Sequence, residues 1–118
     1  MVKYGLRYSN KAGSIAVLDS VKDARKIAYK YIMAHPGVNI VIWAWYKPEE
    51  RYKDKGIIWY NDWNGCILWN DWDEVRLKGE GMPRIVKPDG SLGVRPSKKY
   101  KSFSAMRKHA ERVEAKRR

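Results

Sequence analysis

All six tryptophans of this 118-residue chain lie within residues 38–72. Residues 40–46 are rich in β-branched and aromatic side chains, which favour a β-strand. Because side chains alternate between the two faces of a strand, one face carries Val41, Trp43 and Trp45. The other face carries Ile40, Ile42, Ala44 and Tyr46. Both faces are apolar, so we expect a central strand that is covered on both sides.

The next two strands are predicted to form a hairpin around Asn64-Gly65. Asn-Gly between two apolar runs is a strong short-range hairpin signal, because a type I′ turn requires positive φ at both central residues. A two-residue loop would place Ile57, Trp59, Leu68 and Trp72 on one face, and it is the preferred interpretation. A three-residue loop would instead pair Trp59 with Trp69. The two alternatives differ in register by one residue, and such a slip moves every side chain of one strand to the opposite face.

The remaining pattern predicts an α+β domain with an antiparallel sheet in the order β-β-α-β-β-β. Residues 2–8 and 14–18 read as the first two strands, and residues 74–78 as a further short strand. Ser20 and Asp23 predict a helix start, and His35-Pro36 predicts its end. The helix is expected to pack on one sheet face, through contacts between two apolar sets: Ile40, Ile42, Ala44 and Tyr46 against Ala24, Ile27, Ala28 and Tyr31.

Charge divides the chain into two parts. Residues 1–83 contain 13 Lys+Arg and 10 Asp+Glu, whereas residues 84–118 contain 12 Lys+Arg and only 3 Asp+Glu. Residues 79–83 carry two glycines and a proline, which favour a break between elements. We therefore expect an α+β core domain over residues 1–83 and a basic C-terminal arm and helix over residues 84–118.

The basic arm carries the strongest functional signal in the sequence. A helix is predicted over residues 102–115, with a narrow apolar stripe formed by Phe103, Met106, Ala110 and Val113. Dense positive charge neutralises phosphates and releases their counterions. The predicted phosphate-binding residues are Lys98, Lys99, Lys101, Arg107, Lys108, Arg112, Lys116, Arg117 and Arg118.

The sequence offers little support for catalysis or metal binding. His35 adjoins the proline that ends a helix, His109 lies in the basic arm, and strand residue Cys66 has no candidate base near it in the sequence. Four carboxylates, Asp62, Asp71, Asp73 and Glu74, are oxygen ligands of the kind that Mg²⁺ prefers. Asp62 and Asp71 follow asparagines in turn-like contexts, however, where Asp commonly bonds the local backbone. We therefore expect a non-enzymatic protein without a cofactor or metal.

Two functions remain open. The first is a small nucleic-acid-binding protein for DNA or RNA, in which Trp59, Trp63, Trp69 and Trp72 are candidates for stacking on bases or for an interface. The second is a protein-interaction module, an inhibitor or adaptor that binds an acidic partner, because Trp, Tyr and Arg are enriched at interface hot spots.

A single cysteine favours a reducing, cytoplasmic setting. The longest apolar run, residues 40–46, is far too short to span a membrane, so no membrane partner is expected.

Overall fold

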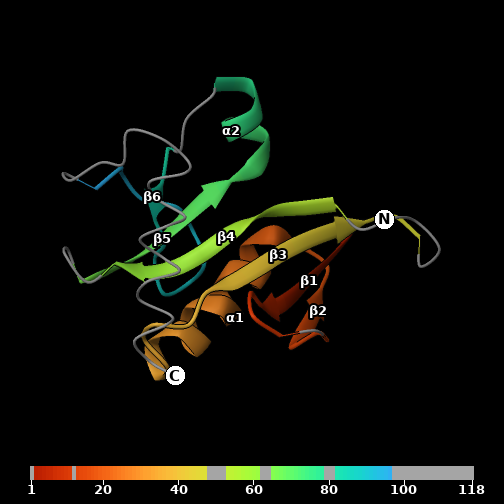
Figure 1. Ribbon diagram of the computed structural model, residues 1–118, viewed down its shortest axis with the longest axis horizontal. Coiled ribbons are helices and arrows are strands. Elements are labelled where there is room, and N and C mark those ends of the chain that lie inside the picture. Colours follow the sequence, from red (N-terminus) through yellow and green to blue (C-terminus); the bar gives the residue numbers. More distant parts are fainter. Residues whose placement is uncertain (1, 12, 48–52, 62–64, 79–81, 97–118) are drawn as a thin grey trace.

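The computed structural model describes residues 2–11, 13–47, 53–61, 65–78 and 82–96. These residues form one six-stranded sheet in the order β2-β1-β3-β4-β5-β6, in which all neighbouring strands are antiparallel (Figure 1). The predicted α+β class with an antiparallel sheet is confirmed. In chain order the elements are β1 (Lys3–Tyr8), β2 (Ala16–Leu18), α1 (Val21–Ala34), β3 (Ile40–Trp45), β4 (Lys53–Asn61), β5 (Cys66–Asp71), α2 (Trp72–Lys78) and β6 (Arg84–Ile85).

Helix α1 begins and ends where the sequence predicts. The Ser20 Oγ accepts a hydrogen bond from the Asp23 backbone N–H at 3.1 Å, which satisfies one of the unpaired donors of the first turn. At the other end, the His35 backbone N–H donates to the Tyr31 carbonyl at 3.0 Å. Pro36 follows at once and cannot extend the helix. His35 is therefore the C-cap residue of α1, through its backbone.

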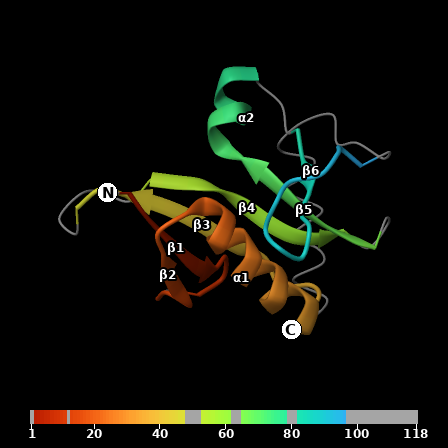
Figure 2. The ribbon, with the colours of Figure 1, turned by 180° about the vertical axis from the view of Figure 1, so that it is seen from behind.

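Helix α1 covers one face of the sheet (Figure 2). Its residues Ala24, Ala28 and Ile32 recur every four positions and are fully buried. They pack with Ile40 and Ile42 of β3, as predicted, within a cluster that also includes Leu6, Ile58, Ile67, Trp69 and Val86. The expected inclusion of Tyr46 and Tyr31 in this packing is wrong, because both side chains are exposed and neither belongs to the cluster. Tyr46 lies just beyond the last residue of β3.

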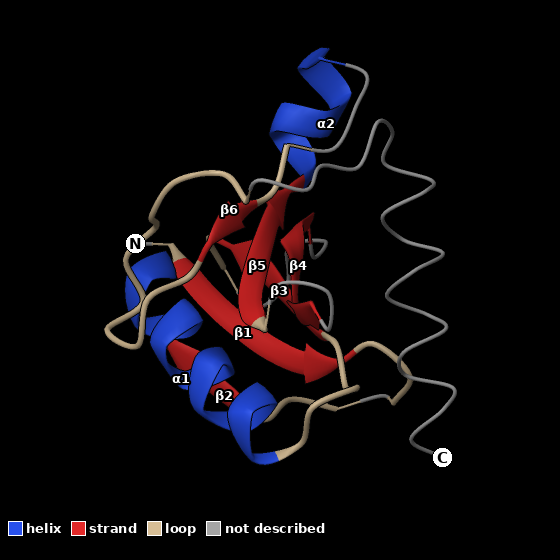
Figure 3. Cartoon of the chain, turned by 90° about the vertical axis from the view of Figure 1, so that its left-hand side faces the viewer, coloured by secondary structure: helices blue, strands red, loops and turns tan. Residues whose placement is uncertain are grey.

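The opposite face of the sheet is also apolar, and the two faces can be followed edge-on in Figure 3. Val41, Ile57, Trp59 and Leu68 form a second buried cluster there. Partly buried Cys66, Trp72 and Ile85 pack against it. The prediction that β3 is covered on both sides is confirmed, because Val41 and Trp43 are each only 6% exposed.

The β4–β5 hairpin has the predicted faces but a different register. Asn61 pairs with Cys66, so four residues connect the strands, and Trp59 lies opposite Leu68. A two-residue loop would have paired Trp63 with Cys66, and a three-residue loop would have paired Trp59 with Trp69. Both predicted registers are therefore wrong. Relative to the register of the two-residue loop, the observed pairing is shifted by two residues along β4. Because side chains alternate with a period of two, this shift leaves each side chain on its predicted face.

Residues 72–78 form helix α2, so the short strand predicted over residues 74–78 is wrong. The Asp71 Oδ1 accepts hydrogen bonds from the backbone N–H groups of Asp73 at 2.8 Å and Glu74 at 3.4 Å. Asp71 is thus the residue that caps this helix, and acidic Asp73 and Glu74 in the first turn favour its dipole.

Residues 84–96 belong to the same sheet and core as the residues before them. Strand β6 pairs with β5, and Val86 is 2% exposed in the cluster under α1. The following turn is fastened to α1, because the Arg25 Nε donates to the Gly90 carbonyl at 2.8 Å. The expected boundary at residue 83 therefore does not separate this segment from the core. The predicted helix over residues 102–115 lies outside the described residues.

Gly90 lies against the backbone of α1, and replacing it should destabilise the protein strongly. Its φ is +89°, and an added Cβ would lie 2.1 Å from the Lys22 carbonyl oxygen. We expect Gly90→Ala to lower the free energy of unfolding by about 2–5 kcal/mol, since backbone strain and overpacking add. Gly13→Ala is the matched control, with φ +94° and nothing within 4 Å of an added Cβ. Urea unfolding of both variants measures the difference, and equal losses of stability would contradict the close approach.

Candidate nucleic-acid interface

The phosphate-binding residues predicted from the sequence all follow Pro96, the last residue that the structure describes. Lys98, Lys99, Lys101, Arg107, Lys108, Arg112, Lys116, Arg117 and Arg118 therefore lie outside the described residues. Within the described part of the chain, other lysine and arginine side chains are the candidates for phosphate contact.

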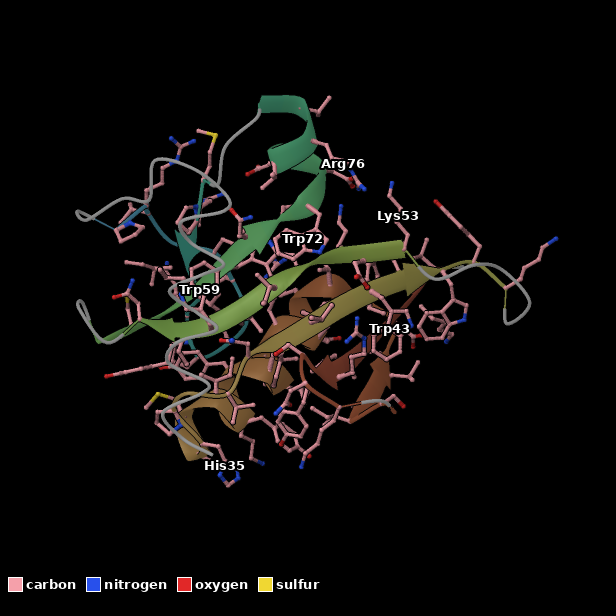
Figure 4. All side chains as sticks on the ribbon, in the orientation of Figure 1. His35, Trp43, Lys53, Trp59, Trp72 and Arg76 are labelled. Atoms are coloured by element: carbon pink, nitrogen blue, oxygen red, sulfur yellow. The ribbon has the colours of Figure 1, made fainter. Side chains whose placement is uncertain are left out.

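Two of the four tryptophans proposed for stacking are core residues. Trp59 is 0% exposed and Trp69 is 3% exposed, so neither ring is offered to a base, and a stacking role for these two is wrong. The reason is that β4 and β5 are interior strands with apolar clusters on both faces. Trp72 is half-buried at the first residue of α2 (Figure 4). Trp63 lies outside the described residues.

Three lysines form an exposed row along α1. Lys22, Lys26 and Lys30 are spaced by four residues, as are the buried residues Ala24, Ala28 and Ile32. The two rows are offset by two residues, or about 200° around the helix, so the lysines point directly away from the sheet. Among the described residues, no carboxylate lies within ion-pair distance of any of the three. We call Lys22, Lys26 and Lys30 the α1 lysine row.

Arg25 lies on the same helix but has a different role. Its guanidinium sits 5.8 Å from the centre of the Trp69 ring, and its Nε bonds the Gly90 carbonyl. Burial lowers the pKa of this group, although Asp71 opposes that shift. Arg25 therefore stabilises the packing of the turn on α1 and is not a free surface cation.

The cations near α2 are neutralised by carboxylates. The Lys55 Nζ lies 3.1 Å from Asp73 and 3.4 Å from Asp71, and the Lys53 Nζ lies 3.3 Å from Asp73. Arg76 also pairs with Asp73. Hydrogen bonds from Arg76 and Lys55 hold the pKa of the Asp73 carboxyl well below its usual range. These charges compensate one another at the end of the sheet, where Figure 4 labels Lys53 and Arg76.

The described residues contain no group of three or more His, Cys, Asp or Glu side chains that could hold a metal ion. Asp71, one of the predicted candidate ligands, caps α2, and Asp73 is engaged with three cations. Asp62 lies outside the described residues. Burial raises the pKa of the Cys66 thiol, which disfavours the nucleophilic thiolate.

A hollow of about 470 Å³ lies where β1, the turn before β2, β3 and β4 meet. Its lining includes Trp43 and Trp45, whose rings stack with centroids 5.8 Å apart and planes inclined by 18°. Arg7 and Asp54 pair across it with an N–O distance of 3.7 Å. We call this the tryptophan pocket, and it is lined by Arg7, Gly13, Ser14, Val17, Trp43, Trp45 and Asp54.

The sequence did not single out the tryptophan pocket. Its residues come from four segments that are separated along the chain, and strand pairing brings them together. The one signal in the sequence was the placement of Trp43 and Trp45 on the β3 face opposite the helix-facing residues. A second hollow, of about 410 Å³, lies at the end of α1, and its lining includes Tyr8, Lys11 and His35.

No helix within the described ranges is long and apolar enough to cross a membrane. Comparison with known proteins adds no relationship: no family model matches the sequence, and no curated protein or solved structure is significantly similar to it. Its function is therefore inferred from the residues of this chain.

Proposed function

We propose that this chain is a small, non-enzymatic nucleic-acid-binding protein that holds the phosphate backbone with lysine and arginine side chains. The observation that carries the proposal is the α1 lysine row, with three exposed cations that face away from the core. Among the described residues no carboxylate lies within ion-pair distance of the row, although Asp89 is near enough to Lys22 for their charges to interact. Cations without an acidic partner can neutralise phosphates, whereas Lys53, Lys55 and Arg76 are already paired.

Residues 97–118 extend the positive charge. They contain nine Lys+Arg and only two carboxylates, Glu111 and Glu114. As part of the proposal, residues 102–115 form a basic helix whose cations face the phosphates. The single cysteine supports a reducing, cytoplasmic setting for this activity.

Binding of the full-length chain to fluorescently labelled single-stranded DNA, single-stranded RNA and duplex DNA tests the proposal. Fluorescence anisotropy at about 50 and about 200 mM salt should show affinity that falls steeply with salt, because counterions are released on binding. No measurable affinity for any of the three at the lower salt concentration would overturn the proposal. Salt-sensitive binding to poly-glutamate in its place would favour an acidic protein partner.

The contribution of the α1 lysine row can be measured separately. Replacing Lys22, Lys26 and Lys30 together with glutamine should flatten the slope of log affinity against log salt by about 0.7–0.9 for each phosphate that is no longer neutralised. The matched control replaces the same three residues with arginine, which keeps the charge and should keep the slope. An unchanged slope in the glutamine variant would remove the row from the interface.

A further inference from the structure

We infer that the tryptophan pocket binds an unpaired nucleobase, with guanine as the expected best ligand. This site rests on the proposed function, to which it adds a preference for single strands. Three features support it: a row of paired residues across the sheet, a bulge in β4 and two charges at the pocket edge.

A row of four paired residues on neighbouring strands crosses the sheet at the pocket, and three of them, Val17, Trp43 and Asp54, line it. Val17 pairs with Gly5, Gly5 with Trp43, and Trp43 with Asp54. A Cβ on Gly5 would lie only 2.2 Å from the Trp43 ring, so glycine is required for the indole to lie against β1. The Trp43 ring fills the space that a side chain on Gly5 would take, and Trp45 stacks on Trp43.

A bulge brings Asp54 to this face. Ile42 pairs with Gly56 and Trp43 with Asp54, so Lys55 is an extra residue in β4. Without it, Asp54 would lie opposite Ala44, on the face that packs against α1. Bulges re-aim side chains in this way and are over-represented next to functional sites. The result is a carboxylate at the edge of an aromatic pocket, at the end of β3 where Figure 4 labels Trp43.

The pocket offers both surfaces that a nucleobase requires. Trp43 is 6% exposed, whereas Trp45 is half-buried, so part of the Trp45 side chain is accessible from solvent. Arg7 and Asp54 remain 33% and 47% exposed, and their pairing distance of 3.7 Å is longer than a hydrogen bond. Both therefore keep capacity for a ligand. A carboxylate accepts from the N–H groups of the guanine Watson–Crick edge, and a guanidinium donates to its O6.

The same chemistry distinguishes this ligand from the alternatives. A base within a duplex is stacked and paired, so its face and its Watson–Crick edge are not accessible. An acidic peptide side chain would meet the Asp54 carboxylate, which opposes the attraction of Arg7. An unpaired base can stack on Trp45, accept a hydrogen bond from Arg7 and donate to Asp54 at the same time.

The direct test follows the six indole N–H signals by NMR while guanosine 5′-monophosphate is added to the full-length protein. The Trp43 and Trp45 signals should shift, and those of buried Trp59 and Trp69 should not. Adenosine, cytidine and uridine monophosphates should give smaller shifts at equal concentration. No shift at Trp43 and Trp45, or equal shifts at all six tryptophans, would overturn the inference.

Variants test the same site in strand binding. Trp45→Ala should weaken binding to guanine-containing single strands by about 5- to 150-fold, the size expected when one base no longer stacks. Duplex affinity should not change. Asp54→Asn keeps the shape of an exposed side chain and should abolish the preference for guanine. The matched control is Tyr46→Ala, which removes an aromatic that is 66% exposed and not part of the pocket.

The outcomes separate this inference from the proposed function. Salt-sensitive binding with equal affinity for single strands and duplex, unaffected by Trp45→Ala, would leave the phosphate interface in place and overturn the pocket. Shifts with the free nucleotide but no affinity for any strand would support the pocket and overturn the phosphate interface.

Discussion

Ile42→Ala is expected to lower the free energy of unfolding by about 2–5 kcal/mol, the range observed when a large buried aliphatic side chain is truncated. Ile42 is 0% exposed and lies at the centre of the face under α1. It is flanked by Leu6 on β1 and Gly56 on β4. Gly56 has no side chain with which to fill the gap, so the resulting cavity collapses poorly and the loss of stability should fall in the upper half of the range.

Urea unfolding measures this loss as a lower midpoint with an unchanged m-value. Tyr46→Ala is the control from the same segment, because its side chain is 66% exposed and should change stability by less than about 0.5 kcal/mol. A loss well under about 1 kcal/mol for Ile42→Ala would show that the packing of β3 on α1 contributes little. A loss of stability for Tyr46→Ala that exceeds the loss for Ile42→Ala would contradict the assignment of Ile42 to the core and Tyr46 to the surface.

The strand faces could be predicted because they depend on a local period of two. Val41 and Ile42 lie on opposite faces, as the alternation in β3 requires. The β4–β5 hairpin has a register that could not be predicted from this alternation. Its faces follow from alternation, but its register depends on the length of the connection, and an even shift in register leaves the pattern of faces unchanged.

Helix α2, the exposure of individual tryptophans and the bulge in β4 could not be predicted from the alternation of side chains. Helix α2 is seven residues long, too short for an apolar period, and its cap Asp71 also suits a turn. Tryptophan-rich composition did not distinguish the core ring of Trp59 from the partly exposed ring of Trp45, because Trp suits both settings. The approach of Asp54 to Trp43 requires a bulge and pairing between distant segments, neither of which the sequence of β4 indicates.

The largest expected effect on binding comes from the C-terminal residues. Removing residues 97–118 deletes nine Lys+Arg and only two carboxylates. If those cations meet phosphates, affinity for duplex and single strands should fall together, with little change in sequence preference, since phosphate contacts do not read bases. The salt slope should flatten by about 0.7–0.9 for each phosphate that is no longer neutralised. About six such phosphates account for a roughly thousand-fold change in affinity between about 50 and 200 mM salt.

A second variant separates the loss of charge from any effect that removing residues 97–118 has on the stability of the protein. Replacing the nine cations with glutamine leaves the apolar stripe of Phe103, Met106 and Val113 in place and removes the charge. Both variants should lose affinity equally if charge alone matters. If truncation also lowers the melting temperature and the glutamine variant does not, the stripe packs on the protein. Retained affinity and slope in the glutamine variant would exclude these nine residues from the phosphate interface and leave the α1 lysine row as its main component.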